Sequence, residues 1–388
     1  SYNGAGGKSI MALDVTNAAA AFGPGNFMWE FRHNNLGHVI NPPTAALLEN
    51  GDWVVLAGNG LNSSDHRARL MVLNASNGNL RDSVVVGTGS ITDPNGLTSA
   101  VPMDNDFNGK IDTIYGGDMH GNVWKFSVSA TGSISAGSLL FTATDSGGTR
   151  QPITGTVDAG AHHIEGQMVV FGTGKYVEVG DNLPTAPATT QTQTLYGIWD
   201  KEDGSPVGSR SNLQAQQITG VSTSNGRESR QLSSNTVNWE NQRGWYIDLS
   251  VGTAEGERSV GRPRIFMGRA AFTTLEPQGD ECSPGALNRL YFVRLLTGAP
   301  ALNLGNGDGD TGAVVISQGA PVFDQGFGIV PAPGSGSRSD ELQLDSSGNP
   351  IAPAAGAACV QRIVGQTNEG IFDVGTLNCG RQSWRQLQ

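Results

Sequence analysis

The chain repeats one short arrangement of apolar and polar residues, in which an alternating apolar strand leads into a tight turn. The turn holds Asp, Asn or a short polar stretch, and in all copies but the first it closes with Gly. Gly suits such turns because it tolerates positive φ. The copies span residues 9–16, 70–78, 123–132, 195–204 and 290–298. This repetition predicts an architecture built from similar β-units.

Strands of a second kind lie between these copies and are rich in β-branched and aromatic residues that end on Gly. Uninterrupted apolar runs of this kind are typical of strands buried on both faces. They span residues 53–60, 113–118, 167–174 and 264–268, and the runs at 312–316 and 361–365 continue the series. The two kinds of strand alternate over the whole chain, which predicts an all-β protein.

A β-propeller accounts best for this alternation. Its blades have four strands and take roughly 40–50 residues each, or more where loops are inserted. At about 55 residues per unit, the 388 residues give a single domain, 1–388, of six or seven blades. A parallel βαβ fold would need helices between the strands, and the only helix candidate is short, at 213–218. Surface insertions rich in Ser, Gly, Pro, Thr or Asn are expected near 180–192, 217–237 and 334–358.

Composition and charge narrow the class further. The chain contains 55 Gly and 18 Pro, which excludes a helical bundle or coiled coil because interior Gly costs a helix about 1 kcal/mol per position. The formal net charge of −11 offers no basic field for nucleic acid or anionic lipid and suits cations. No apolar run approaches the length of a membrane span. Residues 1–7 lack the basic segment followed by an apolar segment that marks a signal peptide, so a mature or shortened chain is expected.

The cysteines are too few for a disulfide-dense scaffold, and none lies in a CxxC or Cys/His metal pattern. The segment between Cys359 and Cys379 is short enough for a bridge, which would leave Cys282 free or paired outside this chain. The pairing is left open.

The most specific chemical signal is the acidic segment 104–112, DNDFNGKID. Side-chain oxygens stand at positions 1, 3, 5 and 9, in Asp104, Asp106, Asn108 and Asp112, and Gly occupies position 6. This is the spacing of a calcium loop, in which alternate residues turn inward and position 7, Lys110, contributes its backbone carbonyl. The Glu that an EF-hand carries at position 12 is absent, so the loop is expected between strands rather than helices.

Alternatives to a calcium site at residues 104–112, and a second possible metal site, also have to be considered. Residues 104–112 could form a hairpin turn without an ion, but three crowded carboxylates would then repel one another, which favours Ca²⁺. Mg²⁺ fits less well because its small octahedral shell retains water. A second segment, 306–312, starts with the same alternate oxygens and then loses the spacing, so Asp308 and Asp310 are weaker metal candidates.

Catalytic patterns are poor. His162 and His163, followed by Glu165, suggest a metal or base, but adjacent side chains in a strand face opposite ways. No nucleophile elbow, HExxH or phosphate-binding loop is present in the sequence. Most tryptophans fall inside predicted strands, which favours packing between blades over a sugar-binding platform. These are Trp29, Trp53, Trp124, Trp199, Trp245 and Trp384.

Several motifs, taken in order, resemble the C-terminal domain of the PilY/PilC family of type IV pilus biogenesis factors and tip-associated adhesins. The calcium loop followed by YGGD and GNVWKF is similar to the family's most recognisable segment, and the resemblance covers nearly the whole chain. The remaining matches are GAGGKSIMALDVT at 4–16, WEF at 29–31, GNG at 58–60, FGTGKY at 171–176, QTLYGIWD at 193–200, GWYIDL at 244–249 and GRQSWRQL at 380–387.

The resemblance implies a modified seven-bladed propeller whose first blade begins before Ser1. It also implies a non-enzymatic, calcium-binding protein at the pilus tip or cell surface, exported through the periplasm. The calcium ligands carry over to Asp104, Asp106, Asn108, the Lys110 carbonyl and Asp112. Implied partners are minor pilins, a host or abiotic surface and the large N-terminal region of family members. The implied role is to support pilus extension against retraction, twitching motility and adhesion.

Two rival functions are kept. A quinoprotein dehydrogenase of the PQQ type is one, because those propellers repeat a strand ending Ala-x-Asp-x-x-Thr-Gly followed by Trp, which residues 11–16 and Trp29 resemble. Against it, the Trp does not recur at a constant offset, and no vicinal Cys pair is present. The other is a carbohydrate-binding propeller, which the tryptophans would serve.

Overall fold

Strands make up nearly all of the regular structure in the computed structural model. It describes residues 7–17, 23–183, 191–224, 227–266, 268–278, 285–303, 310–319, 322, 326–331, 360–367 and 370–378. Within these ranges the helical elements are two single 3-10 turns, Pro24–Asn26 and Arg210–Asn212. None of the described helices is long or apolar enough to cross a membrane.

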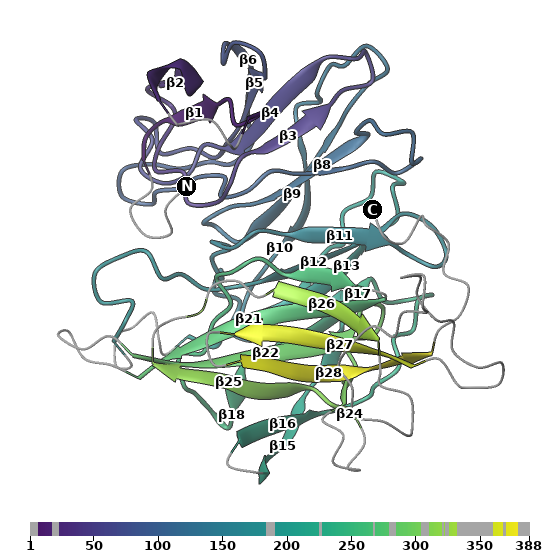
Figure 1. Cartoon of the computed structure of the whole chain (residues 1–388). Helices are drawn as coiled ribbons and strands as arrows, with labels where there is room; N and C mark the ends of the chain where they lie inside the picture. Colours follow the sequence, from purple (N-terminus) through teal and green to yellow (C-terminus); the bar gives the residue numbers. More distant parts are fainter. Residues whose placement is uncertain are drawn as a thin grey trace, which may run out of the picture.

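The N-terminal half forms small antiparallel sheets in chain order, coloured purple to blue in the upper part of Figure 1. A two-stranded sheet of β1 (Ile10–Leu13) and β2 (Phe27–Phe31) comes first. Two four-stranded sheets follow, and neighbouring strands pair in sequence order in each, as blades require. The first contains β3 (Thr44–Leu47), β4 (Trp53–Gly58), β5 (Arg69–Asn74) and β6 (Leu80–Val85), and the second contains β7 (Val101–Met103), β8 (Thr113–Gly117), β9 (Asn122–Ser127) and β10 (Ser138–Thr142).

The C-terminal half has larger sheets that depart from this simple order. A five-stranded sheet has the order β11-β12-β13-β17-β14, and a six-stranded sheet has the order β15-β16-β25-β22-β21-β20. The five-stranded sheet contains β11 (Asp158–Ala161), β12 (Gln167–Gly172), β13 (Thr194–Asp200), β14 (Gln214–Gln216) and β17 (Gly244–Asp248). The six-stranded sheet contains β15 (Ile218–Ser224), β16 (Arg227–Leu232), β20 (Arg264–Phe266), β21 (Arg269–Pro277), β22 (Ala286–Arg294) and β25 (Ala313–Gly319). Two small sheets have two strands each: β18 (Ser250–Val251) pairs with β19 (Thr253–Ala254), and β23 (Leu302–Asn303) pairs with β24 (Asp310–Thr311). The last sheet has three strands in the order β26 (Gly326–Pro331), β27 (Val360–Thr367) and β28 (Gly370–Asn378).

One local expectation, a short helix, is wrong. Residues 213–218 form no helix, because β14 pairs in parallel with β17 and its Gln216 side chain donates to the carbonyls of Asn235 and Thr297, both at 2.7 Å. The polar stretch 217–237, expected as a surface insertion, contains the hairpin β15–β16, in which residues 221–223 are exposed and β16 pairs with β25. Its Arg230 is buried yet carries ion-pair partners, so a polar sequence here is compatible with burial. The expected insertion at 334–358 lies outside the described residues.

The glycines that close the buried strands permit close approach between neighbouring sheets. A Cβ on Gly58, at the end of β4, would lie 2.3 Å from the Leu97 carbonyl oxygen. Gly60 combines a φ of +69° with a distance of 2.0 Å from its would-be Cβ to the His38 carbonyl oxygen. No other residue fits such contacts without moving the backbone. The Gly-ended pattern in the sequence therefore marks backbone crossings between sheets.

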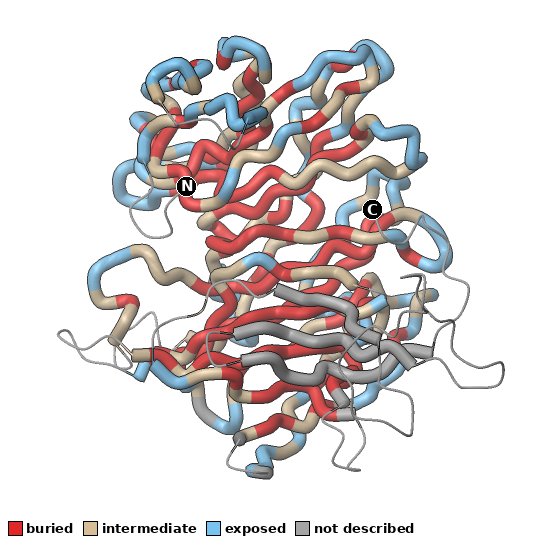
Figure 2. Tube along the Cα trace, in the orientation of Figure 1, coloured by how far each residue is buried: buried red, intermediate tan, exposed pale blue. Residues whose placement is uncertain are grey.

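Apolar side chains fill the spaces between successive sheets, and Figure 2 shows buried residues running through the sheets. Burial of each large side chain contributes roughly 1.5–3 kcal/mol, which makes these interfaces the main source of stability. One cluster joins β3–β6 to β7–β10, a second joins β7–β10 to the five-stranded sheet, and a third joins the five- and six-stranded sheets. They include Leu56, Leu70, Ile114 and Phe126 in the first, Tyr115, Phe141, Phe171 and Tyr196 in the second, and Met168, Trp245, Phe272 and Tyr291 in the third.

Two tryptophans make the same contact in different parts of the chain. The indole N–H of Trp29 donates to the Ala75 carbonyl at 2.9 Å, and a Cβ on Gly78 would meet its ring. Trp245 likewise donates to the Leu295 carbonyl at 2.8 Å, and a Cβ on Gly298 would meet its ring. Both rings are buried, so packing rather than sugar binding accounts for them, although Trp53 is exposed.

We predict that Gly298→Ala destabilises the protein by about 2–4 kcal/mol, since it adds an overpacked contact to a residue at φ +68°. A Cβ there would lie 2.6 Å from the Trp245 ring. The matched control is Gly252→Ala, whose φ is +85° and whose Cβ would meet nothing within 4 Å. It should cost only about 1 kcal/mol. Chemical denaturation measures both, and equal losses would contradict the packing role of Trp245.

Candidate metal centre

The acidic segment connects two antiparallel strands, as the sequence predicts. Strand β7 ends at Met103 and β8 begins at Thr113, and these two residues pair across the ladder. The chain between them curls because Gly109 has φ +88° and Phe107 has φ +62°. Both values fall in the left-handed region, which Gly adopts freely and Phe does not, so the curl at Phe107 is held by the contacts of the loop.

The curled backbone of the loop is held by its own side chains. Asp104 accepts hydrogen bonds from the backbone N–H groups of Asn108 at 3.1 Å and Gly109 at 2.7 Å. Asp106 also accepts from the Asn108 N–H at 3.1 Å, and Asn108 Oδ1 accepts from the Lys110 N–H at 2.8 Å. These bonds tie the exposed backbone of the curl to the side chains of Asp104, Asp106 and Asn108.

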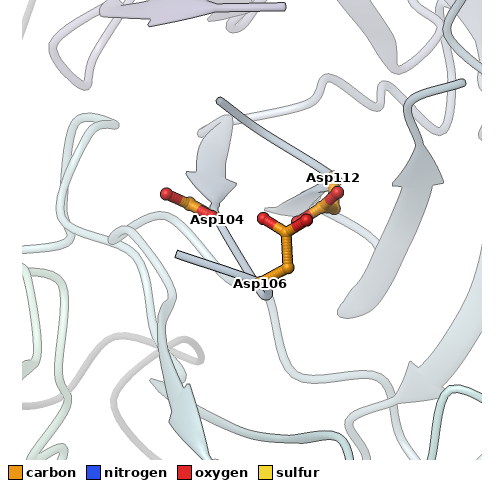
Figure 3. Close-up of side chains that lie close together, drawn as sticks. All are labelled: Asp104, Asp106 and Asp112. Atoms are coloured by element: carbon orange, nitrogen blue, oxygen red, sulfur yellow. The ribbon is translucent and has the colours of Figure 1, made fainter. Parts of the chain in front are cut away.

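Three carboxylates converge in this curl. Asp104, Asp106 and Asp112 each offer an oxygen, and these oxygens lie within 4.8 Å of one another. Figure 3 shows the three side chains close together. Lys110 does not neutralise them, because its Nζ donates to the Glu49 carbonyl at 3.0 Å and lies 3.8 Å from the Glu49 carboxylate. These ligands are all oxygen atoms, which suits a hard cation such as Ca²⁺. Softer metals prefer nitrogen and sulfur ligands and are therefore disfavoured here.

The structure places the predicted ligands as follows. Asp104, Asp106, Asn108 and Asp112 are brought together by the hydrogen bonds of the loop and by the convergence of the carboxylates. The Lys110 carbonyl stays a predicted ligand. Asp308 lies outside the described residues, and so does the side chain of Asp310, whose backbone pairs in β24. Cys282, Cys359 and Cys379 are also outside them, so these predictions stay as they were.

The histidine pair differs from its expected geometry. Strand β11 ends at Ala161, so His162 and His163 lie beyond it and their rings approach to 4.4 Å instead of facing opposite ways. His162 stacks on Trp199 at 4.2 Å and meets the edge of Trp239 at 4.5 Å. Its Nδ1 accepts from the Ile164 N–H at 3.3 Å. Among the described residues, no His, Cys, Asp or Glu group other than the Asp104 cluster gathers three potential metal ligands.

Two residues beside the loop carry no signal in the sequence. Glu49, in the turn between β3 and β4, accepts from the Asn108 side chain at 3.1 Å. Glu202, just after β13, accepts from the Asn105 side chain at 2.5 Å. They are 59 and 97 residues from their partners, so no local pattern could have identified them.

Burial, together with the nearby His163 and Lys201, lowers the pKa of His162 to about 4 from its ordinary value of 6.5. The unfolded chain therefore binds a proton more readily than the folded chain between these values, and stability should fall as the pH drops from about 6.5 to about 4. We expect His162→Phe, which keeps a ring between Trp199 and Trp239, to flatten this dependence. Melting temperatures of wild type and His162→Phe between pH 6.5 and pH 4 measure this dependence. Equal melting temperatures of the two proteins at pH 8 would show that the substitution keeps the packing. An unchanged slope would contradict the assignment.

Comparison with known proteins gives one consistent family. A sequence profile of the PilY1 β-propeller domain matches residues 2–225. A type IV pilus biogenesis factor PilY1 homologue of Xylella fastidiosa is 33% identical over 426 residues, which cover 99% of this chain and 28% of that protein. The type IV pilus biogenesis factor PilY1 of Pseudomonas aeruginosa is 35% identical over 337 residues, covering 76% of this chain and 28% of that protein. The chain thus spans just over a quarter of the length of these relatives.

The fold is matched as well. The crystal structure of the Pseudomonas aeruginosa PilY1 C-terminal domain superposes with a TM-score of 0.74 and 26% identity, covering 95% of this chain and 78% of that one. The successive sheets and the profile both indicate a β-propeller, which confirms the predicted fold class. The chain therefore belongs to the PilY1 β-propeller family of type IV pilus biogenesis factors.

Proposed function

We propose that this chain is the calcium-binding propeller of a type IV pilus biogenesis factor and has no catalytic role. The observation that carries the calcium assignment is the convergence of Asp104, Asp106 and Asp112 in a loop whose backbone is already curled. The family membership supports the pilus role, because its named members are type IV pilus biogenesis factors.

The ion would be held by side-chain oxygens of Asp104, Asp106, Asn108 and Asp112 and by the Lys110 carbonyl. Calcium accepts six to eight oxygen ligands in irregular geometry, so water would complete its shell at this half-exposed loop. Magnesium would demand a tighter octahedron and retain most of its water. Bound calcium would offset the mutual repulsion of the three carboxylates and thereby stabilise the loop.

The role we infer is support of pilus assembly and extension against retraction, and through these of twitching motility and surface adhesion. The partners would be minor pilins at the pilus tip, the N-terminal region of the longer protein, and a host or abiotic surface. The place of action would be the cell surface, reached through the periplasm. The net charge of −11 supports partners other than nucleic acid.

Calcium titration tests the site directly. We expect wild type to bind Ca²⁺ by calorimetry and to gain about 2.7 kcal/mol in unfolding free energy at a hundredfold excess over Kd. Asp104→Ala should lose most of this gain, because it removes a ligand and two backbone hydrogen bonds. Asp82→Ala, at an exposed aspartate on β6, is the control and should keep it. Full calcium affinity in Asp104→Ala would contradict the ligand assignment.

The cellular role has its own test. Asp112→Ala in the full-length protein should leave pilus subunits synthesised but reduce surface piliation and the twitching zone, since the loop would lack its ion. Shearing assays and stab plates measure the two effects. Asp82→Ala again serves as the control. Normal piliation and twitching, in a variant shown by calorimetry to have lost calcium, would separate calcium binding from pilus function.

A further inference from the structure

We propose that Glu49 and Glu202 are positioning residues for the calcium site, and that through them the ion ties together three successive sheets of the propeller. This inference rests on the proposed calcium site in residues 104–112. Glu49 belongs to the β3–β6 sheet and Glu202 to the five-stranded sheet, whereas the loop belongs to the β7–β10 sheet between them. Neither glutamate is among the predicted ligands.

The contact with the preceding sheet runs through Glu49. Its carboxylate accepts from Asn108 Nδ2 at 3.1 Å, and its backbone carbonyl accepts from Lys110 Nζ at 3.0 Å. The Ile111 N–H donates to the Leu47 carbonyl at 2.9 Å, so the end of the loop is also fixed to β3 through the backbone. Asn108 Nδ2 also donates to Asp106 Oδ2 at 3.1 Å, so the orientation of Asn108 Oδ1, the predicted calcium ligand, is set jointly by its own loop and by the neighbouring sheet.

The contact with the following sheet runs through Asn105, which is in the loop but is not a predicted ligand. Its side chain donates to Glu202 at 2.5 Å and accepts from Gln167 Nε2, on β12, at 3.2 Å. Its backbone N–H donates to the Asp112 carboxylate at 2.7 Å. The position of a predicted ligand, Asp112, is therefore connected by one residue to two side chains of the next sheet.

Glu202 is held in an unusual backbone conformation for this contact. Its φ is +61°, in the left-handed region, which costs a residue with a side chain about 1–2 kcal/mol. The Glu202 N–H donates to Asp200 Oδ1 at 2.9 Å, which stabilises the turn. Strain of this kind persists where the surrounding contacts require it, and the contact that uses the Glu202 side chain is the one with Asn105.

A buried polar group fixes the same two sheets behind the loop. Tyr115, on β8, donates to Asp200 Oδ2 at 2.6 Å, and Lys125 Nζ lies 2.6 Å from the same oxygen. Both Tyr115 and Asp200 are buried. Glu202 follows Asp200 closely in the chain, so it extends from a fixed point of the interface toward the loop.

The consequence is a reciprocal coupling. If the ligands are oriented by adjacent sheets, calcium binding strengthens the packing of those sheets, and separating the sheets weakens calcium binding by the same factor. Loss of outer hydrogen-bonding partners typically reduces metal affinity by about 10–100-fold. The ion would then resist separation of the three sheets.

Calorimetry on variants of this chain is the first measurement. Asn105→Ala and Glu49→Ala should each weaken Ca²⁺ affinity by about tenfold. Glu49→Gln and Glu202→Gln keep an acceptor oxygen and should stay within about threefold of wild type, because the role is positioning rather than charge. Glu240→Ala, which removes an exposed carboxylate from a loop far along the chain, controls for net charge. Melting without calcium checks that each variant is folded.

Hydrogen exchange measured by mass spectrometry is the second measurement. Calcium should slow amide exchange in residues 104–112 and also in the turns at 48–52 and 199–204. In Asn105→Ala the protection at 199–204 should disappear while that at 48–52 remains. Protection confined to 104–112 in wild type, or alanine variants with wild-type affinity, would overturn the coupling while leaving the calcium site intact. A wild-type chain that binds no calcium would overturn both.

Discussion

The close crossing of backbones between neighbouring sheets is the constraint on which this propeller depends. A Cβ on Gly58, on β4, would lie 2.3 Å from the carbonyl oxygen of Leu97, in the segment that leads to β7. A Cβ on Gly155, ahead of β11, would lie 2.2 Å from the carbonyl oxygen of Gly261, ahead of β20. These crossings set how closely the neighbouring sheets approach one another. Side chains farther out, such as Ile114 and Phe126, then meet at distances that allow continuous apolar packing.

Charged groups are buried where the six-stranded sheet departs from the simple blade. Arg230 donates to Tyr291 at 2.9 Å and pairs with Glu257, and Arg289 lies 2.7 Å from Glu276. The removal of such charges from water is costly, and their pairing offsets that cost only when hydrogen bonds are well formed. The pairing explains how β16 joins the six-stranded sheet although its sequence is polar, while residues 221–223 of β15 stay exposed.

Features could be predicted from the sequence where the interacting residues are close together in the chain. The strands, the turns and the metal loop are local: Asp104 to Asp112 are close in the chain, and spacing alone predicts that their oxygens converge. The β14–β17 pairing and the burial of Arg230 depend on partners that are distant in sequence, so composition there favoured a helix and a surface loop. Glu49 and Glu202 were missed for the same reason, since a single glutamate far from the loop has no periodicity.

The position of the acidic loop 104–112 in this framework bears on what the proposed ion would do. The crossing near Gly58 already holds the β3–β6 sheet against the segment that leads to β7. The loop instead joins β7 to β8 at an exposed end, where Phe107 and Asp106 are open to solvent. The loop contacts the neighbouring sheets through the backbone bond from Ile111 to Leu47 and through polar side-chain bonds, which are individually weak in water. The divalent ion that we propose would order Asn105 and Asn108, and would thereby act on two of these side-chain bonds at once.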